Sequence, residues 1–155
     1  MSQGPVIVGE AILSNYPLKL WYRQYEHTQD LMREFQLLSS AGSNPHDVPR
    51  RLIEMADHFV SRYGRQIDEI NRQRMQAYEA GLTTIESRVP LPAELPELMR
   101  PVLQLLEEVD AHCRSAELLT PPRSPKVAAL QAWTTSECLA QFDGADPTPW
   151  DGPMD

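Results

Sequence analysis

The stretch LKLWYRQYEHTQDLMREFQLL, residues 18–38, decides the fold that we expect for this chain of 155 residues. Its apolar side chains recur three or four positions apart, and charged side chains fill many of the positions between them. The apolar set is Leu20, Trp21, Tyr25, Leu31, Met32, Phe35 and Leu38. This spacing predicts an amphipathic helix of about 22 residues with one buried face. The helix is expected to end before the Ser-, Gly- and Pro-containing segment 39–45.

The same pattern occurs three more times along the chain, each time between residues that start or stop helices. The second helix is expected to start near Asp47 and to stop at Gly81 or at the Thr83-Thr84 pair, and the other two expected spans are Leu98–Ala116 and Ser124–Gly144. The segment 89–96, which contains three prolines, is interpreted as an extended linker, because a residue before proline avoids the α region. Residues 1–14 are interpreted as an irregular lead-in.

No stretch of the sequence alternates apolar and polar residues as a half-buried strand would. We therefore predict an all-α fold, a four-helix bundle-like single domain over residues 1–144 with a Pro-rich tail over 145–155. The length of the second helix leaves open whether it packs within one chain or across a homodimer.

Charge and hydropathy restrict the classes of partner. The chain carries 22 acidic and 14 basic side chains, a net charge of −8. Affinity for nucleic acid comes largely from Lys and Arg that neutralise phosphate, so no nucleic-acid partner is expected. No stretch approaches the roughly 18 apolar residues of a membrane span. The N-terminus also lacks the basic region of a signal peptide, and we expect a cytoplasmic protein without a membrane partner.

The motifs of common catalytic sites are absent from the sequence. There is no Gly-x-Ser-x-Gly elbow and no Gly-x-Gly-x-x-Gly loop. Cys113 and Cys138 lack metal-ligand spacing and are interpreted as buried, reduced structural residues. An enzyme would need a site built from dispersed residues, with His27, Glu26 and His58 converging in a cleft. We expect no enzyme, no cofactor and no metal.

Aromatic and charged side chains on the first helix indicate a surface for another protein. Trp21 and Tyr22 are adjacent, so one of them leaves the buried stripe, and the neighbouring Arg23 completes a combination that is frequent at protein–protein interfaces. Glu26 lies one turn further along, and Trp150 in the tail is a second docking candidate. The predicted partner-binding residues are Trp21, Tyr22, Arg23, Glu26 and Trp150.

A sensor that holds a small ligand or a metal between its helices is the alternative function. This alternative predicts a cavity lined by Tyr25, His27, Phe59 or Tyr63.

Both ends of the chain also carry a family resemblance. The opening part is NYPL at 15–18, LW at 20–21, RQ at 23–24, EH at 26–27 and LMREFQLL at 31–38. The closing part is LLT at 118–120, Ser124-Pro125, Leu130, Trp133, Glu137 and GADPTPW at 144–150. These stretches resemble small helical bacterial proteins of partner-switching regulation, in which an anti-sigma-factor kinase with a histidine-kinase-like ATPase fold, an antagonist and a PP2C-type phosphatase exchange partners. The resemblance implies an accessory regulator whose partner is such an ATPase or a phosphatase regulator.

Overall fold

The computed structural model describes residues 4–40 and 50–155. Within these residues the chain forms two strands and four helices. In chain order they are β1 (Ile7–Pro17), α1 (Leu18–Ser40), α2 (Arg50–Glu79), β2 (Thr84–Pro92), α3 (Leu95–Arg114) and α4 (Pro125–Phe142). None of the helices in this described part is both long and apolar enough to cross a membrane.

The two strands form an antiparallel sheet, although the helical hairpin α1–α2 separates them in the chain. Ala11 lies opposite Val89, and Tyr16 lies opposite Ile85. Between Leu13 and Tyr16 the register shifts, and Asn15 there has a positive φ of 57°. Such a β-bulge adds one residue to one strand. Leu13 and Tyr16 are consequently both buried, although they are three positions apart.

The predicted all-α class is therefore wrong: four helices and a two-stranded sheet form a mixed α/β fold. Residues 1–14, which were interpreted as an irregular lead-in, contain most of β1, and the segment 89–96, interpreted as a linker, contains the end of β2. Pro90 and Pro92 are accommodated because each strand of a two-stranded sheet is an edge strand, where the missing N–H need not face a neighbour. The bulge at Asn15 disrupts the alternation that would have marked β1 as a strand.

Several predicted helix ends are confirmed. The hydroxyl of Ser124 accepts a hydrogen bond of 3.2 Å from the backbone N–H of Val127, as an N-cap residue does. Gly144, the expected stop of the last helix, has a φ of +96°, a value that favours glycine. The expected cap Asp47 lies outside the described residues, and α2 begins in the description at Arg50.

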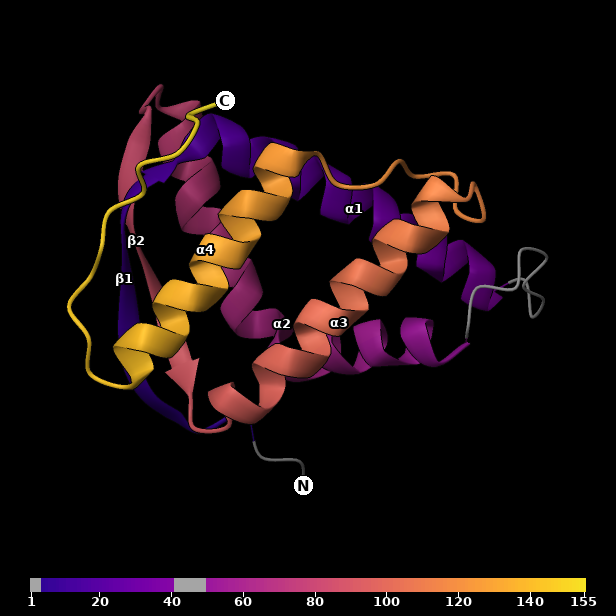
Figure 1. The fold of residues 1–155 in the computed structure, drawn as a ribbon, viewed down its shortest axis with the longest axis horizontal. Helices are drawn as coiled ribbons and strands as arrows, with labels where there is room; N and C mark the ends of the chain where they lie inside the picture. Colours follow the sequence, from indigo (N-terminus) through magenta and orange to yellow (C-terminus); the bar gives the residue numbers. More distant parts are fainter. Residues whose placement is uncertain (1–3, 41–49) are drawn as a thin grey trace.

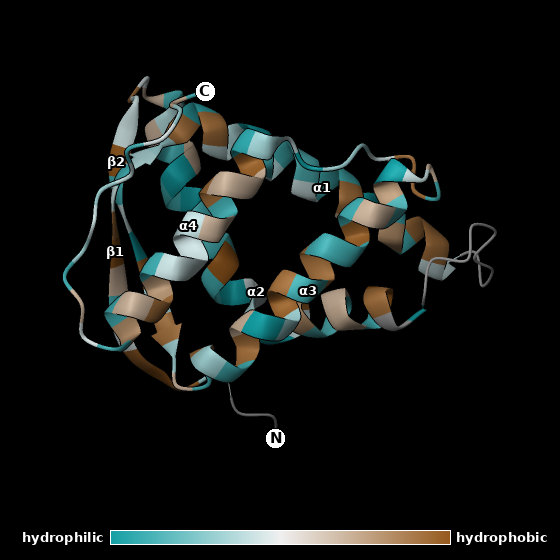
Figure 2. Ribbon diagram, viewed as in Figure 1, coloured by the Kyte–Doolittle hydropathy of each residue, from teal (hydrophilic) through white to brown (hydrophobic). Residues whose placement is uncertain are grey.

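The helices α3 and α4 lie in front of α1 and α2 in Figure 1, and the sheet closes one side of the molecule. Brown and teal segments alternate along the helices in Figure 2, as expected for helices with one buried face.

The buried apolar residues form three clusters. The sheet-side cluster is Leu13, Tyr16, Leu18, Leu20, Trp21, Val127, Leu130 and Trp150. The distal cluster is Leu31, Phe35, Leu52, Ile53, Ala56, Val109, Cys113 and Leu118, and a small third cluster is Ala11, Leu91, Leu95 and Cys138.

The last turn of α4 and the segment after it complete the edge of β1, and that segment runs back along the sheet (Figure 1). The side-chain amide of Gln141 pairs with Ile12 as a neighbouring strand would, accepting from its N–H at 2.8 Å and donating to its carbonyl at 2.9 Å. The backbone N–H of Trp150 donates to the carbonyl of Ser14 at 3.0 Å. The indole of Trp150 packs edge-on against Trp133, with ring centroids 5.3 Å apart. The end of the Pro-rich tail is thus joined to the sheet-side cluster.

Candidate functional site

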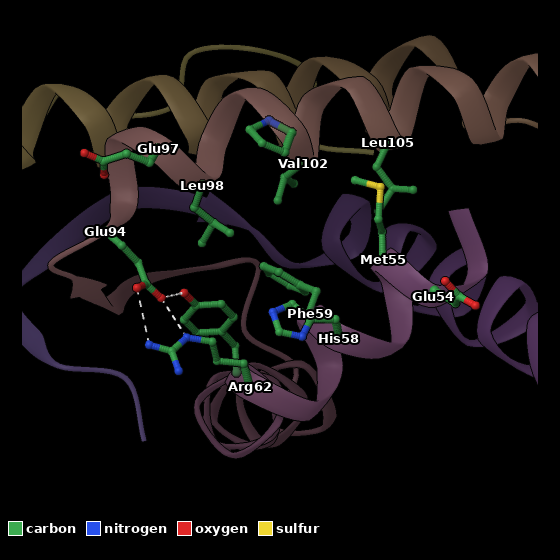
Figure 3. Close-up of a pocket in the computed structure, with 12 residues that line it drawn as sticks. Glu54, Met55, His58, Phe59, Arg62, Glu94, Glu97, Leu98, Val102 and Leu105 are labelled. Atoms are coloured by element: carbon green, nitrogen blue, oxygen red, sulfur yellow. Dashed lines mark hydrogen bonds and ion pairs between the residues drawn. The ribbon is translucent and has the colours of Figure 1, made fainter. Parts of the chain in front are cut away.

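A groove with a volume of about 550 Å³ lies between α2 and α3. We call it the α2–α3 groove. Its lining residues are Glu54, Met55, His58, Phe59, Arg62, Tyr63, Glu94, Glu97, Leu98, Pro101, Val102 and Leu105. Figure 3 shows Leu98, Val102 and Leu105 reaching down from α3 towards Met55 and Phe59 on α2.

Helical spacing aligns the lining residues of the groove, and several of them are only half-buried by the other described residues. On α2, Met55, Phe59 and Tyr63 are four positions apart and therefore stack along one face. The distal cluster includes Ala56 from α2 but leaves Phe59 only half-buried. Leu98 and Val102 of α3 are likewise half-buried. An apolar floor is thus left open to solvent, as is common at binding sites.

One end of the groove holds a polar cluster of three side chains. Glu94 occupies the N-cap position of α3 but does not cap it, so its carboxylate is available to α2. That carboxylate accepts hydrogen bonds from Arg62 Nε at 2.8 Å and Nη2 at 3.3 Å, and from the hydroxyl of Tyr63. Together the three groups form an anchor that ties the start of α3 to α2.

The hydrogen bonds of this anchor shift the protonation of its members. Those from Arg62, followed by the one from Tyr63, lower the pKa of the Glu94 carboxyl. Desolvation, followed by the hydrogen bond to Glu94, raises the pKa of the Tyr63 hydroxyl. The anchor is therefore ionised at Glu94 and neutral at Tyr63 near pH 7, and Arg62 neutralises the carboxylate.

The rim of the α2–α3 groove carries negative charge. Three glutamates and one arginine line it, which leaves two net negative charges when His58 is neutral. Glu94 is paired with Arg62, whereas Glu54 and Glu97 form no ion pair within the described residues. Both of these side chains are exposed, and they lie towards opposite ends of the groove in Figure 3.

The residues predicted to bind a partner are distributed between the core and one surface. Trp21 and Trp150 are buried in the sheet-side cluster, at 1% and 5% exposure. Tyr22 is half-buried and stacks on Tyr78, with ring centroids 4.5 Å apart and planes at 2°. Arg23 is exposed and pairs with the Asp155 side chain at 2.6 Å. Glu26 is also exposed, one turn further along α1.

The residues of the other two hypotheses are only partly brought together. Phe59 and Tyr63 line the α2–α3 groove, whereas Tyr25 packs against the sheet-side cluster. His27 Nε2 lies 2.7 Å from the carbonyl oxygen of Pro121, in the connection between α3 and α4, while His58 lines the groove. Across residues 4–40 and 50–155, no group of three or more His, Cys, Asp or Glu side chains could hold a metal ion.

Sequence reasoning names three of the groove residues as candidates, Phe59 and Tyr63 for a ligand-binding cavity and His58 for a catalytic cleft. Phe59, Tyr63, Leu98 and Val102 belong to regular apolar stripes, and a stripe alone does not tell which part of it stays uncovered. Glu94 was placed in the proline-containing linker. The available signal was the length of the stripe on the second helix, which exceeds the span that one neighbouring helix covers.

Comparison with models of known protein families, with curated proteins and with solved structures finds no match to this chain.

Proposed function

We propose that the protein is a non-enzymatic cytoplasmic regulator that acts by binding another protein, and that the α2–α3 groove is the binding site. The observation that supports this proposal is an open apolar floor of Met55, Phe59, Leu98 and Val102 between two helices. Water in contact with such a floor is released when a partner covers it, which favours association. The Arg62–Glu94–Tyr63 anchor fixes one end of the floor in place before a partner binds.

The resemblance at both ends of the chain suggests the class of partner. We propose a component of a partner-switching module, either a histidine-kinase-like ATPase or a regulator of the phosphatase. In this arrangement the protein would occupy a surface of its partner and exclude a competitor. The face of α1 around Tyr22, Arg23 and Glu26 is a second contact surface in the same proposal.

A matched pair of variants tests whether the groove binds the partner. Leu98→Asp places a charge on the floor of the groove, whereas Leu103→Asp makes the same change on α3 at an exposed residue outside the lining. Neither leucine belongs to the three core clusters. In quantitative affinity purification from the source organism, the same partner is expected with the unaltered protein and with L103D, and it is expected to be lost with L98D.

Circular dichroism of both variants provides the folding control for this comparison. Recovery of the same partner with all three proteins would contradict binding in the groove, and recovery of no reproducible partner would contradict the proposed function.

A small-ligand sensor is the second candidate, because Phe59 and Tyr63 both line the groove and because its volume suits a small molecule. Native mass spectrometry of the purified protein tests this candidate. A bound species that is present in the unaltered protein and L103D, and absent in L98D, would favour the sensor. Protein without any adduct would contradict it.

A further inference from the structure

We infer that the occupant of the α2–α3 groove is a basic amphipathic helix of the partner protein. This inference rests on the proposed function and adds the shape and the charge of the segment that binds. Three features of the groove support this inference: its helical walls, its length and the charge of its rim.

The walls favour a helix over an extended peptide. Both sides of the groove are α-helices, α2 and α3, in which most backbone N–H and C=O groups are paired within each helix. An extended segment obtains much of its affinity from backbone hydrogen bonds to a sheet edge, and helical walls provide no such edge. A helix brings its own backbone bonds and needs only side-chain contacts, which is the usual way of filling a groove between two helices.

The length of the floor sets the size of the contact. Met55, Phe59 and Tyr63 line the α2 side, and Leu98, Val102 and Leu105 line the α3 side. Eight residues of α-helix extend about 12 Å, a little over two turns. A bound helix therefore needs apolar anchors at positions i, i+3 or i+4, and i+7, which cover the same distance on one face.

The charge of the rim selects a basic helix. Glu54 and Glu97 flank the apolar floor without an ion-pair partner among the described residues, and Arg62 is already neutralised by Glu94. Lys or Arg beside the apolar stripe of a bound helix would meet these two carboxylates. Acidic residues in the same places would be repelled, both locally and by the net charge of −8 on the chain.

Two synthetic helical peptides of about five turns test the inference. Both carry leucines at the anchor positions, and they differ only in having lysines or glutamates on the flanks of the stripe. Fluorescence anisotropy is measured with the full chain. We expect the lysine peptide to bind at least about ten-fold more tightly than the glutamate peptide, and to bind more weakly as salt is added.

Variants of the protein separate groove binding from general attraction between opposite charges. Leu98→Asp and, independently, Val102→Asp are expected to abolish binding of the lysine peptide, whereas Leu103→Asp leaves it unchanged. The double variant Glu54→Gln/Glu97→Gln is expected to weaken it roughly three- to ten-fold. Equal binding of the two peptides, or binding that L98D and V102D both leave intact, would overturn the inference.

These outcomes are independent of those for the proposed function. A natural partner that is lost with L98D, combined with equal binding of the two peptides, would retain the function and reject the basic helix. Tight binding of the lysine peptide without any natural partner would reject the function instead.

Discussion

Glu94 makes the anchor of the groove sensitive to pH. Because hydrogen bonds from Arg62 and Tyr63 lower its pKa in the folded protein, its contribution to stability is fully present above the pKa of the unfolded chain. The contribution is lost as pH falls through the lower, folded value. Carbon-detected NMR titration of the Glu94 carboxyl should therefore give a pKa below its ordinary value.

The two donors of this anchor can be removed one at a time. Arg62→Gln should raise the pKa of Glu94 more than Tyr63→Phe does, because Arg62 is the larger cause of the shift. A titration of Glu94 that neither substitution changes would contradict the geometry of the anchor.

The two thiols behave alike although they lie in different clusters. Burial raises the pKa of Cys113 and of Cys138 to about 11, so the reactive thiolate is scarce at neutral pH. We predict that iodoacetamide at pH 7.5 modifies neither thiol in the folded protein and both in denaturant, as counted by intact-mass spectrometry. Rapid labelling of either thiol in the folded protein would show that it is exposed.

At the scale of elements, the helices could be predicted and the strands could not. Periodicity of three to four residues marks α1, α3 and α4 because each has one buried face along its length. The strand β1 begins with two apolar residues that remain exposed, Ile7 and Val8, and contains a bulge at Asn15, so apolar and polar residues do not alternate along it. The prolines of β2 argue for a linker in sequence, and only its position at a sheet edge makes them compatible with a strand.

Only the α2 side of the groove could be predicted from the sequence, because the other side depends on the strand β2, which was not recognised. The stripe that contains Phe59 and Tyr63 is evident in the sequence, and the sensor alternative predicts a cavity lined by Tyr25, His27, Phe59 or Tyr63. Which helix faces that stripe depends on the path of the chain between α2 and α3. That path includes the unrecognised strand β2, so Glu94 and Leu98 could not be placed opposite α2.

The edge of β1 depends on one side chain of another element. Gln141→Ala removes both hydrogen bonds to Ile12, and we expect a loss of about 1–3 kcal/mol in the free energy of unfolding, since a typical net hydrogen bond contributes about 0.5–1.5 kcal/mol. Urea denaturation followed by circular dichroism measures the change. Gln104→Ala at an exposed position of α3 is the matched control and should change stability little. Equal midpoints for the two variants would contradict a structural role for Gln141.

At the scale of the whole molecule, Trp150 connects the end of the chain to its beginning. Its indole is 5% exposed, and its N–H donates to the carbonyl of Pro153 at 2.9 Å. Trp150→Ala should cost about 3–5 kcal/mol, the usual range for truncating a buried tryptophan. The exposed neighbour Asp151 supplies the control, as Asp151→Ala. A midpoint of thermal unfolding that W150A leaves unchanged would mean that the tail is not part of the core.

The contacts of β1 also determine when the protein can fold during its own synthesis. Ile12 bonds to Gln141 across 129 residues, and Asn15 bonds to the Trp150 carbonyl across 135. At about 5–20 residues per second, a ribosome needs roughly 6–27 s to add that much chain. Throughout this interval the newly made β1 lacks its edge partners, so the native core forms only after Trp150 has left the exit tunnel.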